Sequence, residues 1–284
     1  MDSTNNRKIK IKINDLVKIY KRGSVEVVAL RGLNAKFYSG EIAVIEGPSG
    51  CGKTTLVNLI GGLDRQSAGE IIIHGRNGND DTITNLGKLN NRDLEIFRRN
   101  RIGIVFQFMN LIPSLIAEEN VSLPLLLSGY SLKEQKEIAH KMLERTNILK
   151  RSKHKPGALS GGEQQRIAIS AALVNNPDII IADEPTGELD SVTREEILDL
   201  FKDLIDKSPH KCLIIVSHDR AVERIADRIL TIKDGLIIRE RRPGESISDE
   251  EGNEVLKQKI YQYQDEIAQL KEKLNTINKL ITKN

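Results

Sequence analysis

The sequence predicts an α/β fold with a parallel sheet, joined by an antiparallel β region and an inserted block of helices. A short apolar strand at 41–46 runs directly into a glycine-rich loop and then a helix. A second apolar run at 179–182 ends in Asp183 and Glu184, as a buried strand of a parallel sheet can. Between these segments, apolar residues three and four apart indicate helices over 118–149.

Composition limits the class of protein. The 284 residues suffice for one large domain, or for a domain with an appendage. Hydrophobic residues make up 39% and charged residues 29%, which is typical of a folded soluble protein. The net charge of +3 is too balanced to indicate a nucleic-acid partner.

The cellular compartment of the protein is inferred from its cysteines and from the length of its apolar runs. Neither Cys51 nor Cys212 suggests a disulfide, so a reducing compartment is expected. No apolar run approaches the roughly 20 residues needed to span a bilayer, and residues 1–10 lack the apolar core of a signal peptide. We therefore expect a cytoplasmic protein that can sit on a membrane through a partner.

The first half of the chain alternates strands and helices after an expected disordered start at 1–8. Strands are expected at 10–20, 25–30, 41–46, 70–74 and 102–106, and helices from 53 to about 63 and at 93–100. A turn is expected at 21–24, and 76–91 is expected to be mostly a polar surface loop.

The second half begins with helices at 118–127 and 132–149, which we interpret as a helical subdomain covering about 108–158. It continues with helices at 193–206 and 220–225, a strand at 212–217, and a hairpin of 228–233 with 236–240. Residues 243–252 then resemble a linker, and 253–284 form a separate helix.

The glycine-rich loop is suited to binding phosphate. Its position between a strand and a helix is the context that identifies a P-loop, whose backbone N–H groups point at phosphate oxygens. We expect Lys53 to reach the β- and γ-phosphates and the Thr54 hydroxyl to coordinate Mg²⁺. The loop comprises Gly47, Pro48, Ser49, Gly50, Cys51, Gly52, Lys53, Thr54 and Thr55.

Asp183 and Glu184 have the chemistry for metal binding and hydrolysis. Asp183, the first carboxylate after the apolar strand, is expected to hold Mg²⁺, through water. Glu184, one residue on, is expected to point away from the side chain of Asp183 and can polarise a water placed in line with the γ-phosphate. Two solvated acids are the alternative, and a P-loop in the same chain makes that alternative weak.

Three further residues lie at strand ends, where side chains meet the ligand crevice of an open sheet. The amide oxygen of Gln107 can bind the metal or the water, and His218 can donate a hydrogen bond to the γ-phosphate. Tyr20 can stack on adenine. Taken singly, His218 is more often a satisfied polar residue and Tyr20 more often an edge-strand residue that packs locally.

A second phosphate-binding turn is expected near the middle of the chain. The sequence Leu159-Ser160-Gly161-Gly162-Glu163-Gln164-Gln165-Arg166 places a Gly-Gly turn at the start of a helix. Free backbone N–H groups and the positive end of the helix dipole favour an anion there. One chain would then hold two phosphate sites.

Together these motifs resemble the nucleotide-binding subunit of ATP-binding cassette transporters. The resemblance extends from Ile11 to about Glu240 and covers seven motifs in the same order. They are Tyr20, the P-loop, Gln107, the signature 159–166, the Asp183-Glu184 pair, Leu189-Asp190 and His218. Residues 61–64, 174–177 and 182–187 are similar to the lipoprotein-release and macrolide-export branch, near the cell-division ATPases.

The resemblance implies a P-loop NTPase domain at 9–242, with Glu184, His218 and Gln107 as catalytic residues and Thr54, Gln107 and Asp183 at Mg²⁺. It also implies a head-to-tail homodimer around two ATP molecules. Each ATP would be held by one chain's P-loop and, in trans, by Ser160, Gly161, Gly162, Glu163, Gln164 and Asp190 of the other.

The resemblance further implies a membrane partner and no nucleic acid. ATP binding would close the dimer and hydrolysis would reopen it, at the inner face of the cell membrane. The helical subdomain would contact an integral membrane permease-type subunit, with Gln107 linking that contact to the γ-phosphate. The alternatives are a soluble cassette ATPase acting on nucleic acid or ribosomes, and a nucleotide-dependent scaffold without turnover.

The C-terminal segment has a heptad pattern of its own. Its apolar residues are separated alternately by four and three, which predicts an amphipathic helix with a coiled-coil seam. A self-dimerising coiled coil and a helix that docks on its own domain or on a membrane subunit remain equal alternatives. The seam comprises Leu256, Ile260, Tyr263, Ile267, Leu270, Leu274, Ile277 and Ile281.

Overall fold

The computed structural model describes residues 7–23, 25–75 and 83–245. Contacts divide the chain into Met1–Pro243 and Gly244–Asn284, and the description below concerns the first of these units. The predicted helix at 253–284, most of the predicted linker at 243–252 and residues 1–6 of the predicted disordered start lie outside the described residues.

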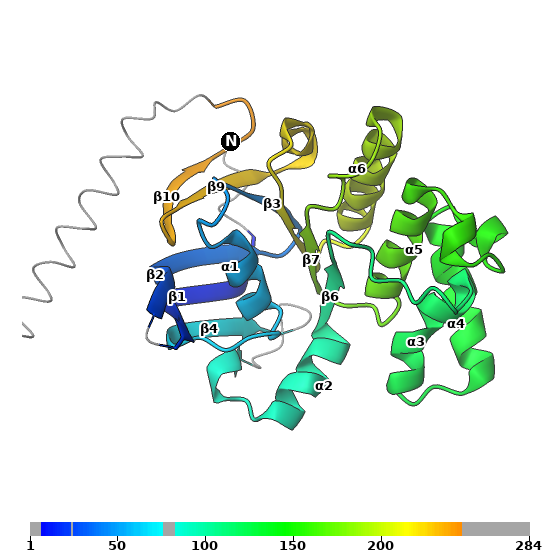
Figure 1. Cartoon of the computed structure of the whole chain (residues 1–284), viewed down its shortest axis with the longest axis horizontal. Helices are drawn as coiled ribbons and strands as arrows, with labels where there is room; N and C mark the ends of the chain where they lie inside the picture. Colours follow the sequence, from blue (N-terminus) through cyan, green and yellow to red (C-terminus); the bar gives the residue numbers. More distant parts are fainter. Residues whose placement is uncertain (1–6, 24, 76–82, 246–284) are drawn as a thin grey trace, which may run out of the picture. The chain divides into compact units, whose positions relative to one another are not determined.

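The central sheet has six strands in the order β10-β9-β3-β8-β7-β6 (Figure 1). All neighbouring strands are parallel except the edge pair β9–β10. The strands are β3 (Glu41–Glu46), β6 (Ile102–Val105), β7 (Ile179–Asp183), β8 (Cys212–Val216), β9 (Arg228–Lys233) and β10 (Leu236–Arg241). The predicted α/β fold with a parallel sheet is confirmed.

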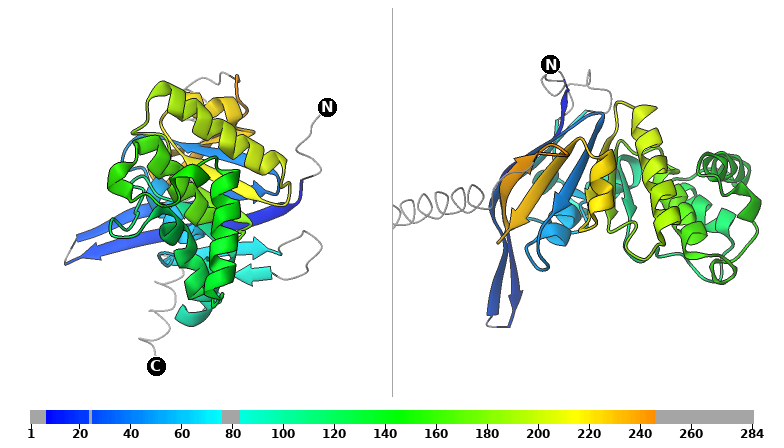
Figure 2. Two further views of the ribbon diagram at one scale, coloured as in Figure 1. Left: turned by 90° about the vertical axis from the view of Figure 1, so that its right-hand side faces the viewer. Right: turned by 90° about the horizontal axis from the view of Figure 1, so that it is seen from above.

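A four-stranded antiparallel sheet has the order β2-β1-β4-β5. Its strands are β1 (Ile9–Arg22), β2 (Val25–Tyr38), β4 (Ala68–His74) and β5 (Ile83–Asn85), and the β1–β2 hairpin reaches well past its neighbours (Figure 2). The prediction was wrong in two places: β2 continues beyond residue 30, and β1 continues into the predicted turn at 21–24. Within 76–91, which was predicted to be mostly loop, the structure adds β5 and the short 3₁₀ helix η2 (Leu86–Lys88).

Helix α1 (Lys53–Ile60) packs between the two sheets. Its buried residues share one apolar cluster with β1, β2 and β4 on one side and with β3, β7 and β8 on the other. The predicted end near residue 63 is three residues too late, because Gly61 and Gly62 follow and Gly62 has φ +64°.

Helices α5 (Gly161–Leu173) and α6 (Ser191–Asp206) cover the opposite face of the central sheet (Figure 1). Alternation along β7 explains the two-sided burial, because successive side chains point to opposite faces of a sheet. Ile179 and Ile181 join the cluster around α1, whereas Ile180 and Ala182 join the cluster beneath α5 and α6. Because both faces of β7 are buried, the direction of the side chain at its last residue, Asp183, is fixed.

The helical block contains α3 (Ala117–Leu127) and α4 (Leu132–Arg145), and α2 (Asn91–Arg101) precedes β6. The apolar cluster of the helical block also includes Ile167 and Val174, so its packing extends past residue 158 into α5 and beyond. The expected helix 132–149 ends at Arg145, since Asn147 adopts φ +58° and two 3₁₀ helices, η3 (Leu149–Arg151) and η4 (Pro156–Ala158), follow. Within the described ranges, no helix is long and apolar enough to cross a membrane.

A buried ion cluster joins the antiparallel sheet to the core. Lys10 Nζ of β1 lies 2.5 Å from Asp178 Oδ2, and Arg101 Nε of α2 lies 2.7 Å from Asp178 Oδ1. Burial alone raises the pKa of Asp178, but the hydrogen bonds from Arg101 and Lys10 outweigh it and hold that pKa below its ordinary value. Asp178 directly precedes β7, so the cluster secures the start of that strand.

Candidate functional site

The predicted residues of the first phosphate site converge at one edge of the central sheet. β3, β8, β7 and β6 are consecutive parallel neighbours, and their ends are level, since Ile45 pairs with Val216, Asp183 with Val216, and Val105 with Ala182. The P-loop therefore follows β3, His218 follows β8, the carboxylate pair ends β7, and Gln107 follows β6. Ligands bind outside the carboxyl ends of strands in such sheets.

The P-loop is a tight turn that requires glycine at two positions. Gly47 has φ +148°, and a Cβ there would lie 2.2 Å from the Ile232 carbonyl oxygen. Gly52 has φ +109°, and its Cβ would lie 2.7 Å from the Ala29 carbonyl oxygen. No side chain can be accommodated at those separations, so these glycines let the loop pack against β9 and β2.

The helix that follows the loop begins without a side-chain cap. The N-cap of α1 is Gly52, and no side chain accepts from its first turn. By contrast, α2, α4, α5 and α6 each begin with a side chain that accepts from a backbone N–H group. The uncapped N–H groups and the helix dipole favour an anion at α1. Lys53 Nζ lies beside them and donates to the carbonyls of Gly47 and Pro48, at 2.7 and 3.0 Å.

Asp183 and Thr54, two of the residues predicted to hold Mg²⁺, lie close together. The Thr54 side chain is close enough to Asp183 to lower the pKa of that carboxyl, so a hydroxyl and a carboxylate oxygen lie near one another. Burial and then the charge of Glu184 raise the pKa of Asp183, and the Thr54 hydroxyl and the charge of Lys53 oppose this rise only in part. An oxygen-donor set of this kind suits Mg²⁺. Gln107 is exposed, two residues past β6.

Glu184 and His218 are in direct contact. His218 Nδ1 donates to Glu184 Oε1 at 2.8 Å, and Glu184 adopts the left-handed conformation, with φ +47°. Such a backbone is uncommon for a non-glycine residue and often marks a functional position. Sequence analysis did not find Ser217, whose Oγ donates to Glu184 Oε2 at 3.2 Å. A small hydroxyl residue between an apolar strand and a site histidine was the available signal.

Tyr20 lies in the β1–β2 hairpin beside the P-loop. It pairs with Val27 of β2, two residues before Ala29, which contacts Gly52. Its hydroxyl donates to Asp64 Oδ2 at 2.9 Å, and Lys18 Nζ lies 4.7 Å from the ring centroid. Asp64, noted in the sequence only as part of the motif at 61–64, therefore helps to orient Tyr20. Tyr20 is 40% exposed, and its stacking on adenine stays a prediction.

The signature segment begins α5. Gly161 and Gly162 are the first two helical residues and Ser160 is the N-cap, so the predicted Gly-Gly turn at the start of a helix is the first turn of α5 itself. Ser160 Oγ accepts from the Glu163 N–H at 3.3 Å, and Glu163 Oε2 accepts from the Ser160 N–H at 2.9 Å. This capping box fixes the start of the helix. Gln164 Nε2 donates to the Leu159 carbonyl at 3.1 Å.

Gly162 brings the signature helix against α6. A Cβ at Gly162 would lie 2.2 Å from Thr193 Cγ2, so any larger residue there would force the Thr193 side chain to move. Thr193 in turn donates to Asp190 Oδ2 at 2.7 Å, and Asp190 is the N-cap of α6. The structure thus gives Asp190 a local role beside its predicted one in trans. Within the described ranges, no hydrogen bond or ion pair joins 160–164 to 47–55.

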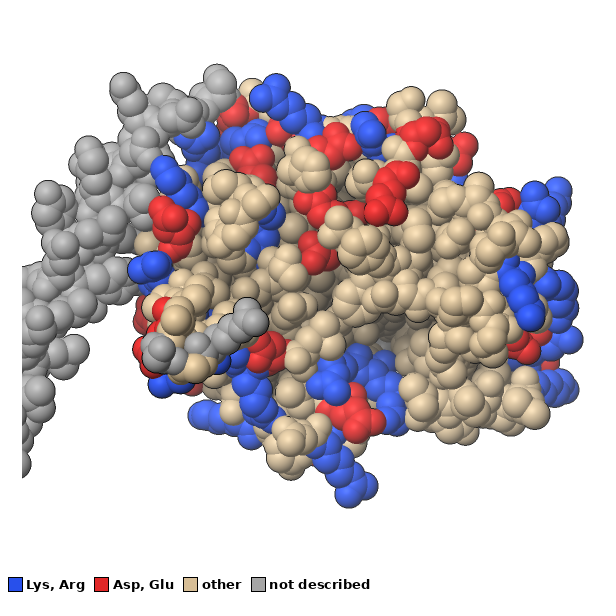
Figure 3. Space-filling view, viewed as in Figure 1, with Lys and Arg blue, Asp and Glu red and all other residues tan. Residues whose placement is uncertain are grey.

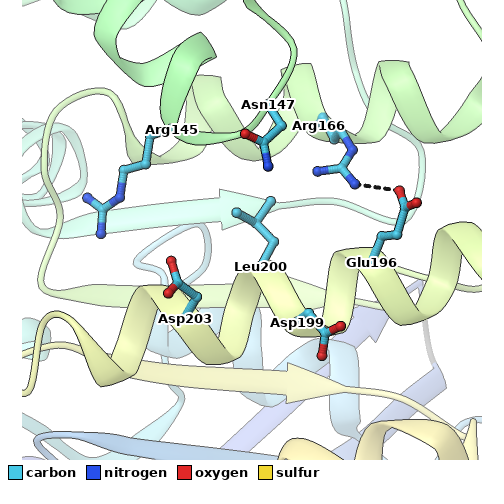
Figure 4. Close-up of a pocket in the computed structure, with 7 residues that line it drawn as sticks. All are labelled: Arg145, Asn147, Arg166, Glu196, Asp199, Leu200 and Asp203. Atoms are coloured by element: carbon cyan, nitrogen blue, oxygen red, sulfur yellow. Dashed lines mark hydrogen bonds and ion pairs between the residues drawn. The ribbon is translucent and has the colours of Figure 1, made fainter.

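A polar cleft of about 550 Å³ lies between α6 and the α4–α5 pair, away from the P-loop (Figure 4). Arg166 of the signature helix lies 2.6 Å from Glu196 of α6 and also donates to the Thr146 carbonyl. Figure 4 shows this pair at one end of the cleft and Arg145 at the other. The pair therefore ties the helical block to the core.

Comparison with known proteins shows the family to which this chain belongs. The model of the ABC transporter family matches residues 30–187. The chain belongs to this family. The lipoprotein-releasing system ATP-binding protein LolD of Porphyromonas gingivalis is 44% identical over 77% of this chain and 94% of LolD. The macrolide export ATP-binding/permease protein MacB of Hyphomonas neptunium is 40% identical over 80% of this chain but 34% of MacB.

A solved structure supports the fold of the cassette. It is the dimeric post-hydrolysis state of the ATP-binding cassette MJ0796, bound to ADP and Pi. An ATP-binding protein with that designation comes from Methanocaldococcus jannaschii. The similarity has a TM-score of 0.74 and 40% identity, and covers 83% of this chain and 100% of the other. The prediction of a cassette of the lipoprotein-release and macrolide-export branch is confirmed.

Proposed function

We propose that this chain is the ATP-hydrolysing subunit of a membrane complex, in which it dimerises around two ATP molecules and drives a conformational change in a membrane partner. The observation that supports this function best is the convergence of the P-loop, His218, Asp183-Glu184 and Gln107 at the ends of four neighbouring strands. That arrangement provides a phosphate cradle, a metal ligand and a base around one point.

ATP binding is assigned to the P-loop and its surroundings. The uncapped start of α1 and Lys53 would hold the phosphates, and the Tyr20 ring would stack on the adenine. The oxygens of Thr54 and Asp183 would hold Mg²⁺, with Gln107 completing the set. The ion supplies charge neutralisation for the γ-phosphate when it is bound.

Hydrolysis is assigned to Glu184. Its carboxylate would accept a proton from the attacking water, and His218 would contact the γ-phosphate once it releases Glu184 Oε1. The second chain would complete the site with its residues 160–164 and Asp190. The dimeric state of MJ0796 with ADP and Pi supports this arrangement by analogy.

A groove supports docking of a permease-type subunit. It holds about 380 Å³ between α2, β6, α3 and α5, and Leu63 and Leu127 are 47% and 65% exposed there. Arg98 and Arg99 line one side, and Figure 3 shows basic side chains gathered at the lower edge of this face, beside a hollow. Phe106 also lines the groove, directly before Gln107, so the groove adjoins the site.

The occupant that fits this groove is an amphipathic helix of the membrane subunit, with apolar residues facing Leu127 and acidic residues facing Arg98 and Arg99. MacB supports a permease-type partner, because its name joins ATP-binding and permease functions and the match to this chain spans about a third of it. LolD supports the same class of complex. The cassette would accordingly sit at the inner face of the cell membrane. The nucleic-acid and ribosome alternative finds no support among these relatives.

Leu127→Arg tests the membrane partner. A charged residue in the groove should remove an apolar anchor worth about 2 kcal/mol, or roughly 30-fold in affinity. Co-purification of membrane proteins from detergent extract should be lost, while basal ATP hydrolysis stays near wild type.

Ile83→Arg is the matched control, since Ile83 is 64% exposed on the edge strand β5, outside the groove. It should retain every membrane partner. Retention of the same partners by Leu127→Arg would exclude this groove as the docking site. Absence of any membrane partner from the wild-type extract would count against a membrane complex.

A further inference from the structure

Ser217 is a buried residue between β8 and His218. Ser217 is only 2% exposed, and its backbone N–H donates to the Ile45 carbonyl at 3.2 Å. Ile45 belongs to β3, immediately before the P-loop. The backbone of Ser217 is thereby fixed to the strand that leads to the phosphate loop.

The hydroxyl of Ser217 has one direction left in which to donate. The Asp219 N–H donates to Ser217 Oγ at 3.1 Å and occupies one of its lone pairs. Glu184 Oε2 lies 3.2 Å from the same oxygen. A carboxylate only accepts, so the hydroxyl hydrogen is directed to Glu184. The donor and the acceptor come from adjacent strands, since the Glu184 N–H also donates to the Val216 carbonyl at 2.8 Å.

The two oxygens of Glu184 are held by partners that differ in freedom. His218 Nδ1 holds Oε1, but the His218 side chain is 76% exposed and lies mostly in solvent. Ser217 holds Oε2 from a buried position. If His218 turns toward a γ-phosphate, it must give up Oε1, and Ser217 then remains on the carboxylate.

We propose that Ser217 is a positioning residue, which holds Glu184 Oε2 so that the carboxylate keeps its orientation after His218 releases Oε1. This inference rests on the proposed role of Glu184 as the general base. A glutamate with an unanchored carboxylate samples several rotamers, and only some of them aim the base at an attacking water. Ser217 should therefore affect the rate of hydrolysis and leave ATP affinity unchanged.

Steady-state hydrolysis by the full chain, at saturating Mg²⁺ and varied ATP, tests this assignment. For Ser217→Ala we expect kcat to fall by about tenfold, equivalent to about 1.4 kcal/mol, with KM near wild type. Ser217→Cys nearly keeps the size of the side chain but offers only a weak S–H donor, so its kcat should fall by a similar factor. Ser217→Thr restores the hydroxyl and should recover most of kcat. Thermal unfolding of each variant shows which of them are folded.

Glu184→Gln, measured in parallel, separates this inference from the proposed function. Suppose that Glu184→Gln is inactive while folded Ser217→Ala or Ser217→Cys turns over at the wild-type rate. The positioning role of Ser217 is then wrong, and the assignment of Glu184 as the general base is retained. Equal losses in Ser217→Thr and Ser217→Ala, or a rise in KM that accounts for the loss, would also overturn it. Wild-type turnover by Glu184→Gln would overturn both assignments.

Discussion

Glu184→Gln is expected to bind ATP, to lose hydrolysis by about 10²–10⁴-fold, and to accumulate ATP-dependent dimers. The amide has nearly the shape of the carboxylate but cannot accept the proton from water. Binding rests on the P-loop and α1, which the substitution does not touch. Phosphate release measures the loss, and light scattering with and without ATP measures the dimers.

Glu137→Gln is the matched control for this substitution. Glu137 is an exposed carboxylate on α4, in the helical block, so its neutralisation should leave the hydrolysis rate near wild type. Glu184 would lose its assignment as the base if its glutamine variant hydrolysed ATP like the control. Loss of ATP binding would instead indicate that the variant disturbs the fold of the site.

Ser160→Asp is expected to abolish hydrolysis without loss of fold or of ATP binding by the single chain. Asp is as good an N-cap as Ser, so the start of α5 should persist. Its charge would face the partner's γ-phosphate. Two like unit charges 4 Å apart cost about 4 kcal/mol at an effective dielectric of 20, which is roughly a thousandfold in rate. Phosphate release measures the loss of hydrolysis, and thermal unfolding shows whether the fold is retained.

Ser160→Ala separates charge from capping. It removes the N-cap at a cost of about 1 kcal/mol in stability, but it adds no charge. Its loss of hydrolysis should therefore be much smaller than that of Ser160→Asp. If folded Ser160→Asp keeps wild-type turnover, this end of α5 does not face a phosphate. Loss of ATP binding by monomeric Ser160→Asp would place Ser160 at its own chain's nucleotide.

The first phosphate site was predictable because its determinants are local. Gly47 and Gly52 have positive φ angles within the loop's own backbone, and Asp183, Glu184, Gln107 and His218 each follow or end an apolar run. In a parallel sheet all such ends meet at one edge, so strand identity alone brings these residues together. The observed strand order shows this convergence.

The contacts that orient those residues could not be predicted, because they join segments far apart in the chain. The Ser217–Glu184 hydrogen bond spans 33 residues, and Asp64 meets Tyr20 across 44. The approach of Gly162 to Thr193 depends on how α5 packs on α6. The sequence shows a glycine pair there, which is equally consistent with a turn or with a close helix contact.

The errors in the antiparallel sheet have local causes. The alternation of β2 is broken near Gly32, which has φ +83°, and the pairing shifts there as Leu33 pairs with Leu16 but Arg31 with Val17. A bulge of this kind ends the visible pattern while the strand continues. β5 has only three residues at the sheet edge, too few for a recognisable period.

The central claim is that hydrolysis requires two chains, because residues 160–164 complete the site of the facing chain. The most direct test measures ATP hydrolysis per chain while the protein concentration is lowered through the monomer–dimer transition, which light scattering monitors on the same samples. We expect the rate per chain to fall in proportion to the dimer fraction and to approach zero for the monomer. A constant rate per chain down to concentrations at which the protein is monomeric would contradict the claim.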